Sequence, residues 1–394
     1  MTSTPFRLLH TSDWHLGLTV HRFERIEQQR DMLRQIGDIA AREHVDALIV
    51  SGDLFNVSQP SAQVQQMFSD EITAIRNSCP DMAIIITAGN HDSASRHEVF
   101  RTPLELLGIY VIGSIADGLP ESVMVNVGDK GFVAAVPYVH ERNLPDNFYS
   151  NVLAHIESLN TGGLPVVLMA HTAVHGCRFR GHSGATERTI GGIDSVDVAS
   201  LGTGYDYLAL GHIHLPHTLP SPSATARARY SGSPIAVSFD EDYAHSVTLV
   251  EIASHGATPT ITEIPINDPC PMVTIPSEGF TDLDSALAEL KEYPDDQEAY
   301  LRLNVEVDDY LPTDAEERAR TISKDKKAQF CLINARRRSS DTDDEEAPRS
   351  FTVSEFRSMD VADIAGIYLT EKGVEFSDEL RQMLSTIIDE CNED

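Results

Sequence analysis

Short apolar runs alternate with longer amphipathic stretches in the first part of the chain. Residues 6–10, 47–50 and 83–87 are rich in β-branched and other apolar side chains, and each run ends in polar residues. They predict three buried strands. Residues 25–43, 60–77 and 96–107 carry apolar side chains at helical spacing. Ser58 is the candidate N-cap of the second helix, with Pro60 in its first turn. This alternation indicates an α/β sheet with crossover connections.

Further apolar runs continue the pattern to about residue 265. They predict strands at residues 132–136, 166–169, 207–210, 228–230 and 246–252. We therefore assign residues 1–265 to one α/β domain.

The pattern changes after residue 265, where Asn-Asp-Pro-Cys-Pro at residues 267–271 is typical of a linker. Residues 282–293 and 312–323 then have helical spacing, whereas residues 301–307 and 329–335 are typical of strands. These elements predict a small α+β domain at residues 270–338. Residues 339–350 are expected to form an acidic linker.

The last segment, residues 351–394, is expected to be helical and to bind a partner protein. Ser377 can cap a helix there. That helix would place a stripe of apolar residues on one face: Leu380, Met383, Leu384, Ile387 and Ile388.

Composition narrows the cellular setting. The 394-residue chain has no stretch of the roughly 20 apolar residues that a membrane span needs, and residues 1–10 do not resemble a signal peptide. The five cysteines are scattered, which indicates free thiols rather than a disulfide or a zinc site. We therefore expect a cytoplasmic protein.

The formal net charge of −31 weighs against direct binding to nucleic acid, because such proteins usually carry a basic surface. Residues 341–394, however, contain 16 acidic and four basic side chains. The acidity is thus partly a property of the tail, which favours a basic partner for that segment.

Polar side chains of the kind that bind metals follow five of the predicted strands. In chain order they are Asp13 and His15, Asp53, the run Asn90, His91 and Asp92, then His171, and finally His212 and His214. The carboxyl ends of the strands are where an open α/β sheet builds its binding site.

Each of these motifs also has an ordinary structural explanation. Asp-x-His occurs often in loops, Gly-Asp is a common turn, and His171 alone would more often be a core or surface histidine. Gly-Asn-His-Asp at residues 89–92 is more specific, because a turn needs only Gly-Asn. Gly-His-Ile-His at residues 211–214 puts two imidazoles on one side of an extended segment. Their combination at strand ends favours a metal centre.

Carboxylate, imidazole and amide-oxygen ligands suit Mn²⁺, Fe²⁺ or Zn²⁺, and the absence of cysteine among them argues against a structural zinc site. Two ions about 3.5–4 Å apart can hold a hydroxide and clamp a phosphoryl group. One carboxylate must then bridge the ions, and Asp53 is the natural candidate.

This order of motifs resembles the calcineurin-like metallophosphoesterase superfamily over residues 6–270. Ser-Gly-Ser-Pro-Ile at residues 231–235, followed by Ser-Phe-Asp-Glu at residues 238–241, is similar to a DNA-nuclease group within that superfamily. The resemblance implies an α/β fold with a two-sheet sandwich flanked by helices. It also implies a small α+β capping domain and C-terminal helices that dock on a coiled-coil ATPase.

The resemblance also implies a role for each residue of the centre. One metal would be held by Asp13, His15, Asp53 and His214, and the second by Asp53, Asn90, His171 and His212. His91 would be catalytic, assisting departure of the 3′ oxygen, and Asp92 would orient His91 or its loop. Archaeal and eukaryotic relatives carry another active-site histidine at the position of Asn56, so the support of His91 stays open.

The implied activity is that of a DNA nuclease subunit with two divalent ions, most readily Mn²⁺, that acts in DNA repair, recombination and replication. It would degrade duplex DNA from 3′ to 5′ and cut single strands and hairpins. A homodimer would assemble with two ATPase subunits into a heterotetramer, and residues 60–77 and 96–107 correspond to the segments that dimerise in this group.

Two alternatives remain from the sequence. The first is a phosphomonoesterase or small-molecule phosphodiesterase of the same fold, although small substrates need neither a capping domain nor an acidic tail. The second is a metal-free scaffold, against which the complete ligand set argues. Arg178, Arg180, His182 and Arg188 lie in a Gly-rich loop that either contacts DNA or is simply solvated. The basic run at residues 336–338 is equally open.

Overall fold

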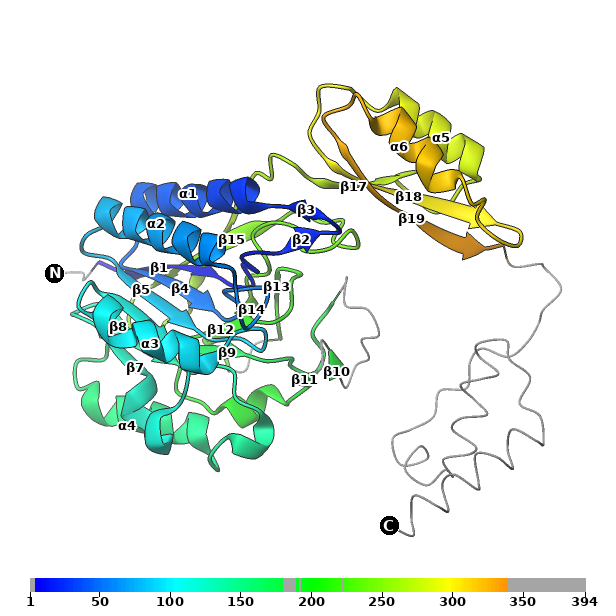
Figure 1. The fold of residues 1–394 in the computed structure, drawn as a ribbon. Coiled ribbons are helices and arrows are strands. Elements are labelled where there is room, and N and C mark those ends of the chain that lie inside the picture. Colours follow the sequence, from blue (N-terminus) through cyan, green and yellow to red (C-terminus); the bar gives the residue numbers. More distant parts are fainter. Residues whose placement is uncertain (1–3, 180–188, 191–192, 221–222, 339–394) are drawn as a thin grey trace, which may run out of the picture. The chain divides into compact units, whose positions relative to one another are not determined.

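The computed structural model describes residues 4–179, 189–190, 193–220 and 223–338. Two six-stranded sheets form the first domain (Figure 1). The first sheet has the order β16 (Thr260–Pro265), β15 (Ser246–Ile252), β1 (Phe6–Thr11), β4 (Ala47–Ser51), β5 (Ala83–Thr87) and β6 (Ile109–Ile112). The second has the order β13 (His217–Thr218), β14 (Arg227–Tyr230), β12 (Tyr207–Gly211), β9 (Val166–His171), β8 (Gly131–Ala135) and β7 (Met124–Val127).

Parallel strands form the centre of both sheets. In the first sheet β1, β4, β5 and β6 are parallel, and β15 and β16 join antiparallel at one side. In the second sheet β8, β9, β12 and β14 are parallel, with β7 and β13 antiparallel at the two edges. The parallel strands therefore carry their carboxyl ends to one edge of each sheet.

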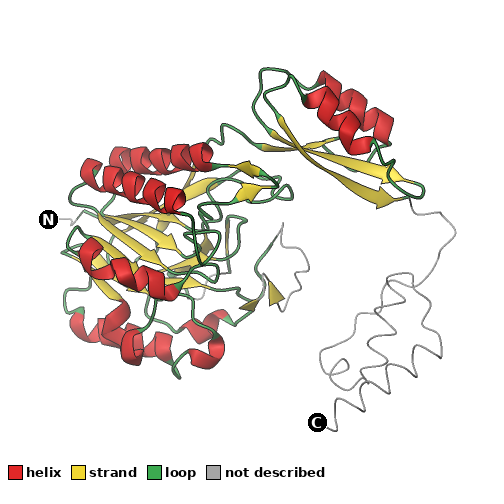
Figure 2. Ribbon diagram, in the orientation of Figure 1, coloured by secondary structure: helices red, strands yellow, loops and turns green. Residues whose placement is uncertain are grey.

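The helices enclose the two sheets (Figure 2). They are α1 (Ile26–Glu43), α2 (Ala62–Ser78), α3 (Ala94–Glu105) and α4 (Phe148–Leu159). In β1, Leu8 belongs to the core shared by the two sheets, whereas Leu9 belongs to the core beneath α1 and α2. Successive side chains of a strand point to opposite faces, so the apolar run at residues 6–10 covers both faces of a buried strand.

Short elements complete the described part of the domain. They are the hairpins β2 (Thr19–Val20) with β3 (Phe23–Glu24) and β10 (Thr189–Ile190) with β11 (Ile193–Asp194), and the 3₁₀ turns η1 (Ala116–Gly118), η2 (Pro120–Val123), η3 (Glu141–Asn143) and η4 (Val198–Leu201). No helix in the described ranges is both long and apolar enough to cross a membrane.

The small domain consists of β17 (Met272–Ile275), α5 (Leu283–Glu292), β18 (Tyr300–Val307), α6 (Ala315–Ser323) and β19 (Gln329–Arg337). Its three strands are all parallel, with β18 in the middle. The expected α+β layout is therefore refined to a βαβαβ unit, because each helix is the crossover between two parallel strands. The short strand β17 was absent from the prediction.

The predicted strands and helices of both domains agree with the structure to within a few residues, but the predicted cap of α2 is wrong. Ser61, not Ser58, is the N-cap, and its hydroxyl accepts a hydrogen bond from the backbone N–H of Val64 at 3.3 Å. The helix begins at Ala62, so Pro60 precedes the cap instead of lying in the first turn. The predicted linker at residues 339–350 and the tail helix lie outside the described residues.

Candidate metal centre

The centre forms where the carboxyl ends of strands from both sheets meet. Asp13 follows β1 and Asp53 follows β4, while His171 is the last residue of β9. His212 comes directly after β12, and the strand pairing sets Gly211 opposite His171. The two parallel sheets thus bring side chains from distant parts of the sequence to one edge.

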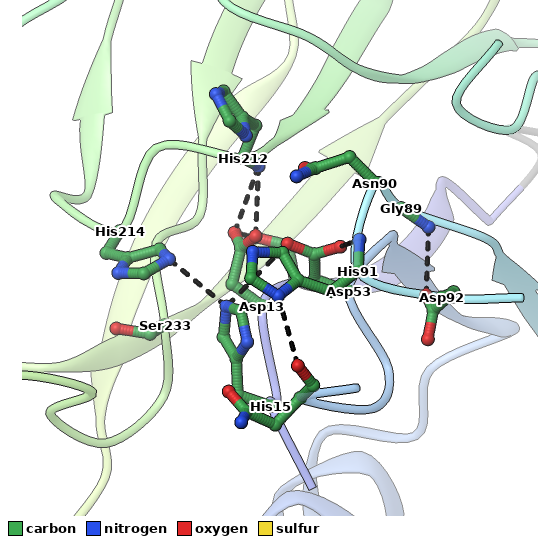
Figure 3. Close-up of polar contacts among 12 residues, drawn as sticks. Asp13, His15, Asp53, Gly89, Asn90, His91, Asp92, His212, His214 and Ser233 are labelled. Carbon is green, nitrogen blue, oxygen red and sulfur yellow. Dashed lines mark hydrogen bonds and ion pairs between the residues drawn. The ribbon is translucent and has the colours of Figure 1, made fainter. Parts of the chain in front are cut away.

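Two groups of buried side chains could each hold a metal ion. They are Asp13 with His15 and His214, and Asp53 with His171 and His212. Within each group the ligand atoms lie within 4.8 Å of one another (Figure 3). We call them the first triad and the second triad.

Asp53 lies between the two triads. Its Oδ2 is 3.7 Å from His15 Nε2 and 3.5 Å from His171 Nε2, one atom from each triad. This position agrees with the predicted bridging carboxylate. Asn90 adds an amide oxygen 3.0 Å from His171 Nε2, so the predicted eighth ligand position also faces the second triad.

The backbone of several ligands adopts the left-handed region. The φ angles are 54° for Asp13, 43° for His15, 50° for Asp53 and 95° for His212. Such conformations cost of order 1–3 kcal/mol each and persist only where the surrounding structure enforces them. Here the Asp13 N–H donates to the Gly52 carbonyl at 3.0 Å, and the His212 N–H donates to the Asp13 carboxylate at 3.0 Å.

Two glycines permit this close approach of the loops. A Cβ atom at Gly89 would collide with the carboxylate and backbone nitrogen of Asp53, and one at Gly211 would collide with the Ser51 carbonyl. The glycines of the Gly-Asn-His-Asp and Gly-His-Ile-His motifs are therefore required by packing around the ligands.

The hydrogen-bond pattern fits a bound cation. His214 Nδ1 lies 2.8 Å from the Glu241 carboxylate, so Nδ1 carries the proton and Nε2 presents a lone pair. That Nε2 lies 3.2 Å from His15 Nε2. Likewise, His171 Nδ1 donates to the Ser51 carbonyl at 2.9 Å, which turns the Nε2 lone pair toward Asp53. Acceptors that face acceptors need a shared cation, and this donor set suits Mn²⁺, Fe²⁺ or Zn²⁺.

The electrostatics point the same way. Burial would raise the pKa of Asp53, but nearby imidazoles, foremost His171, hold that pKa well below its usual range. Burial would lower the pKa of His171 and of His214, but Asp53 and Glu241 respectively raise each to about 9. Burial lowers the pKa of His15 to about 3. The buried carboxylates therefore draw positive charge into the centre, which divalent ions would supply.

His91 lies beside the centre and outside both triads. Its side chain is exposed, and its ring centre is 5.0 Å from that of His15. Its backbone N–H donates to Asp53 Oδ1 at 2.9 Å. Its Nδ1 lies 3.0 Å from the backbone carbonyl of Asn56, so the other ring nitrogen, Nε2, is available to a substrate. The question left open at Asn56 thus involves the main chain, which any residue type could provide.

Asp92 has a different environment. Its buried carboxylate accepts hydrogen bonds from three backbone N–H groups, those of Leu54, Phe55 and Gly89. These bonds join the loop after β4 to the loop that carries Asn90 and His91. Figure 3 shows the Asp92 side chain turned toward Gly89. Of the two predicted roles, orienting the loop therefore matches the geometry.

Several residues of the site were missed from the sequence. Glu241 and Ser12 contact the ligands His214 and Asp13 directly. Ser12 adjoins a ligand and Glu241 ends the Ser-Phe-Asp-Glu motif, so both signals were present but unused. The basic loop is only partly described. The backbone N–H of Arg178 donates to His217 at 3.1 Å, and the other three basic positions lie outside the described residues.

A two-sheet sandwich with two buried ligand triads around one carboxylate defines a dinuclear metallophosphoesterase. Residues 6–216 match the family model described as calcineurin-like phosphoesterase, and residues 269–369 match the model described as type 5 capsule protein repressor C-terminal domain. By family, the chain is an SbcD-type member of the calcineurin-like phosphoesterases.

Curated relatives support this assignment. The SbcD subunit of the nuclease SbcCD from Rhodobacter capsulatus is 32% identical over 72% of this chain and 75% of that protein. The Bacillus subtilis protein of the same name is 32% identical over 77% of this chain and 80% of its own length. The Escherichia coli K12 protein is 26% identical over 77% of this chain and 79% of its own length.

Proposed function

We propose that the chain is the metal-dependent DNA nuclease subunit of an SbcCD-type complex. Its expected reactions are 3′→5′ degradation of duplex DNA and cutting of single strands and hairpins. The observation that carries this proposal is the complete pair of buried triads with the exposed His91 beside them. The names of the curated relatives support DNA as the substrate.

The first ion would be held by Asp13, His15 and His214, the second by His171, His212 and Asn90, with Asp53 shared. Two divalent ions, most readily Mn²⁺, would supply an activated water and neutralise the charge on the scissile phosphate. The protein holds these ligands in a dry pocket, because the side chains of both triads are buried.

His91 would act at the open side of the centre. The Asn56 carbonyl keeps the proton on Nδ1 and fixes the plane of the ring. The remaining nitrogen, Nε2, would hold the proton that passes to the leaving 3′ oxygen. General acid catalysis of this kind is worth about 10²–10⁴-fold in rate.

The test compares wild type with His91→Ala and with His140→Ala, which removes another exposed histidine. Metal content and cleavage of duplex and hairpin DNA with Mn²⁺ are measured for all three. We expect His91→Ala alone to lose about 10²–10⁴-fold in rate while retaining its metal. Equal cleavage by all three would refute the role of His91, and faster turnover of small phosphate esters than of DNA would favour a small-molecule phosphodiesterase or phosphomonoesterase.

We further propose that the protein acts in the bacterial cytoplasm with an SbcC-type coiled-coil ATPase, as a heterotetramer of two nuclease and two ATPase subunits. The shared name of the relatives supports this assembly. The ATPase would contribute much of the DNA-binding surface, which offsets the net charge of −31. Deletion of residues 351–394 should abolish co-purification with the ATPase but keep metal binding, and retained association would contradict the role of the tail.

The homodimer would form through α2 and α3. Large apolar side chains are exposed on α3 and directly after it: Val99 (69%), Phe100 (50%), Leu106 (85%) and Leu107 (52%). Clustered exposed apolar groups usually mark an interaction surface. The proposed domain boundaries, residues 1–265 and 270–338, leave this surface wholly within the nuclease domain.

A further inference from the structure

The segment after β14 packs against the outer side of the metal centre. It contains the Ser-Gly-Ser-Pro-Ile and Ser-Phe-Asp-Glu motifs, which phosphoester chemistry as such does not need. The Ser233 N–H donates to the His214 carbonyl at 3.1 Å, and a Cβ atom at Gly232 would collide with that same carbonyl. The segment therefore lies directly against the backbone of a predicted ligand.

Glu241, at the end of this segment, holds the side chain of His214. It is 6% exposed, and its Oε1 lies 2.8 Å from His214 Nδ1. Its Oε2 accepts hydrogen bonds from the Ser233 hydroxyl at 3.2 Å and the Val237 N–H at 3.0 Å. His245 Nε2 lies 3.9 Å from the same oxygen. The carboxylate is thus fixed from several sides with one oxygen directed at the ligand.

A second contact reaches the same triad through hydroxyl groups. Ser231 Oγ lies 2.9 Å from Ser12 Oγ, and the Ser12 hydroxyl donates to Asp13 Oδ2 at 2.6 Å. Two of the three ligands in the first triad are therefore supported by this segment. The third, His15, has a buried Nδ1 without a hydrogen-bond partner among the described residues.

The second triad is supported differently. His171 Nδ1 donates to the Ser51 carbonyl at 2.9 Å, and Asp53 Oδ1 accepts from the His91 N–H at 2.9 Å. Both of these partners belong to the main chain. A carboxylate acceptor strengthens the electron donation of an imidazole to a metal more than a neutral carbonyl does, because it stabilises the positive charge that builds up on the ring.

We propose that Glu241 is a positioning residue for the first metal alone, which it serves by fixing the His214 tautomer and directing Nε2 at the ion. This inference rests on the dinuclear centre of the proposed function. It gives the Ser-Gly-Ser-Pro-Ile and Ser-Phe-Asp-Glu motifs a shared task, namely the outer support of one of two otherwise similar sites. Loss of such support typically weakens metal binding about 10–100-fold.

The experiment is a Mn²⁺ titration of chelator-stripped full-length protein, followed by calorimetry and by electron paramagnetic resonance. Glu241→Gln is compared with wild type and with Asp240→Asn, which removes a carboxylate one position away that pairs instead with Arg302 at 2.6 Å. Wild type and Asp240→Asn should bind two ions. Glu241→Gln should bind one ion with wild-type affinity and the other about 10–100-fold more weakly, with an uncoupled Mn²⁺ spectrum at intermediate loading.

Two further variants separate positioning from a general loss of structure. Ser233→Ala removes one hydrogen bond to Glu241 and should give a smaller change at the same site. His214→Ala and His214→Ala/Glu241→Gln should bind Mn²⁺ equally, because Glu241 acts through His214.

The inference is overturned by wild-type binding in Glu241→Gln, by equal weakening at both sites, or by additive effects in the double variant. A wild-type protein that binds fewer than two ions would instead overturn the dinuclear centre itself.

Discussion

The Asp92 carboxylate offers a sharp test of how the catalytic loop is held. Asp92→Ala removes the acceptor of three backbone N–H groups that lie 2.9–3.0 Å from it. A buried N–H left without a partner costs about 1–3 kcal/mol, so three set a range of about 3–9 kcal/mol. Burial raises the pKa of Asp92, which shows that the buried carboxylate itself costs free energy. We therefore expect the lower end, a loss of about 3 kcal/mol in the free energy of unfolding.

Urea unfolding of the metal-free protein measures this loss, and the DNA cleavage rate at saturating Mn²⁺ measures its effect on function. The loop that carries Asn90 and His91 loses its tie to the loop after β4, and a displacement of about 1 Å can cost about 10²-fold in rate. Asp70→Ala, on the exposed face of α2, is the control and should change stability by less than about 0.5 kcal/mol. If Asp92→Ala lost its cleavage rate at an unchanged urea midpoint, Asp92 would act in the chemistry, and its role in holding the loop would be refuted.

Three further predictions concern the dimer, the packing and the pH response. Phe100→Glu should convert the dimer to a monomer in light scattering, whereas Leu159→Glu, at a 49% exposed leucine on α4, should not. Gly211→Ala should lower the melting temperature and weaken Mn²⁺ binding, because the new Cβ would collide with the end of β4, and Gly162→Ala, in open space, should do neither. Burial lowers the pKa of His10 from 6.5 to about 3, so this residue is neutral in the fold and takes up a proton only on unfolding. The free energy of unfolding should therefore fall as the pH drops from 6.5 toward 3, and His10→Phe should reduce that slope in urea titrations at several pH values. Unchanged slopes, a monomeric Leu159→Glu protein or a stable Gly211→Ala protein would each contradict the corresponding argument.

Local pattern was sufficient for much of the first domain. The runs at residues 6–10, 47–50 and 83–87 lie in strands of the first sheet because apolar, β-branched residues with both faces buried have few other stable arrangements. Weaker patterns escaped. Helix α4 and the strands β6, β7, β16 and β17 were not predicted, since short or partly exposed elements carry little periodic signal.

The ligand residues could be identified from the sequence because their side-chain chemistry is specific and they recur at strand ends. Parallel strands necessarily bring those ends to one edge, which is why Asp13, Asp53 and His171 meet although they are far apart in the chain. The sequence by itself thus determined the residue types of the centre and the kind of ion they suit.

Only the tertiary structure decided how those ligands are supported. Glu241 reaches His214 from 27 residues away, and the Asn56 carbonyl reaches His91 from 35 residues away. The second contact uses a main-chain atom that every residue possesses, so no residue type could announce it. Asp92, which the motif placed next to the catalytic histidine, turns to the backbone of another loop instead. Hydrogen-bond partners depend on distance and direction in space, and these are set only when both sheets are packed together.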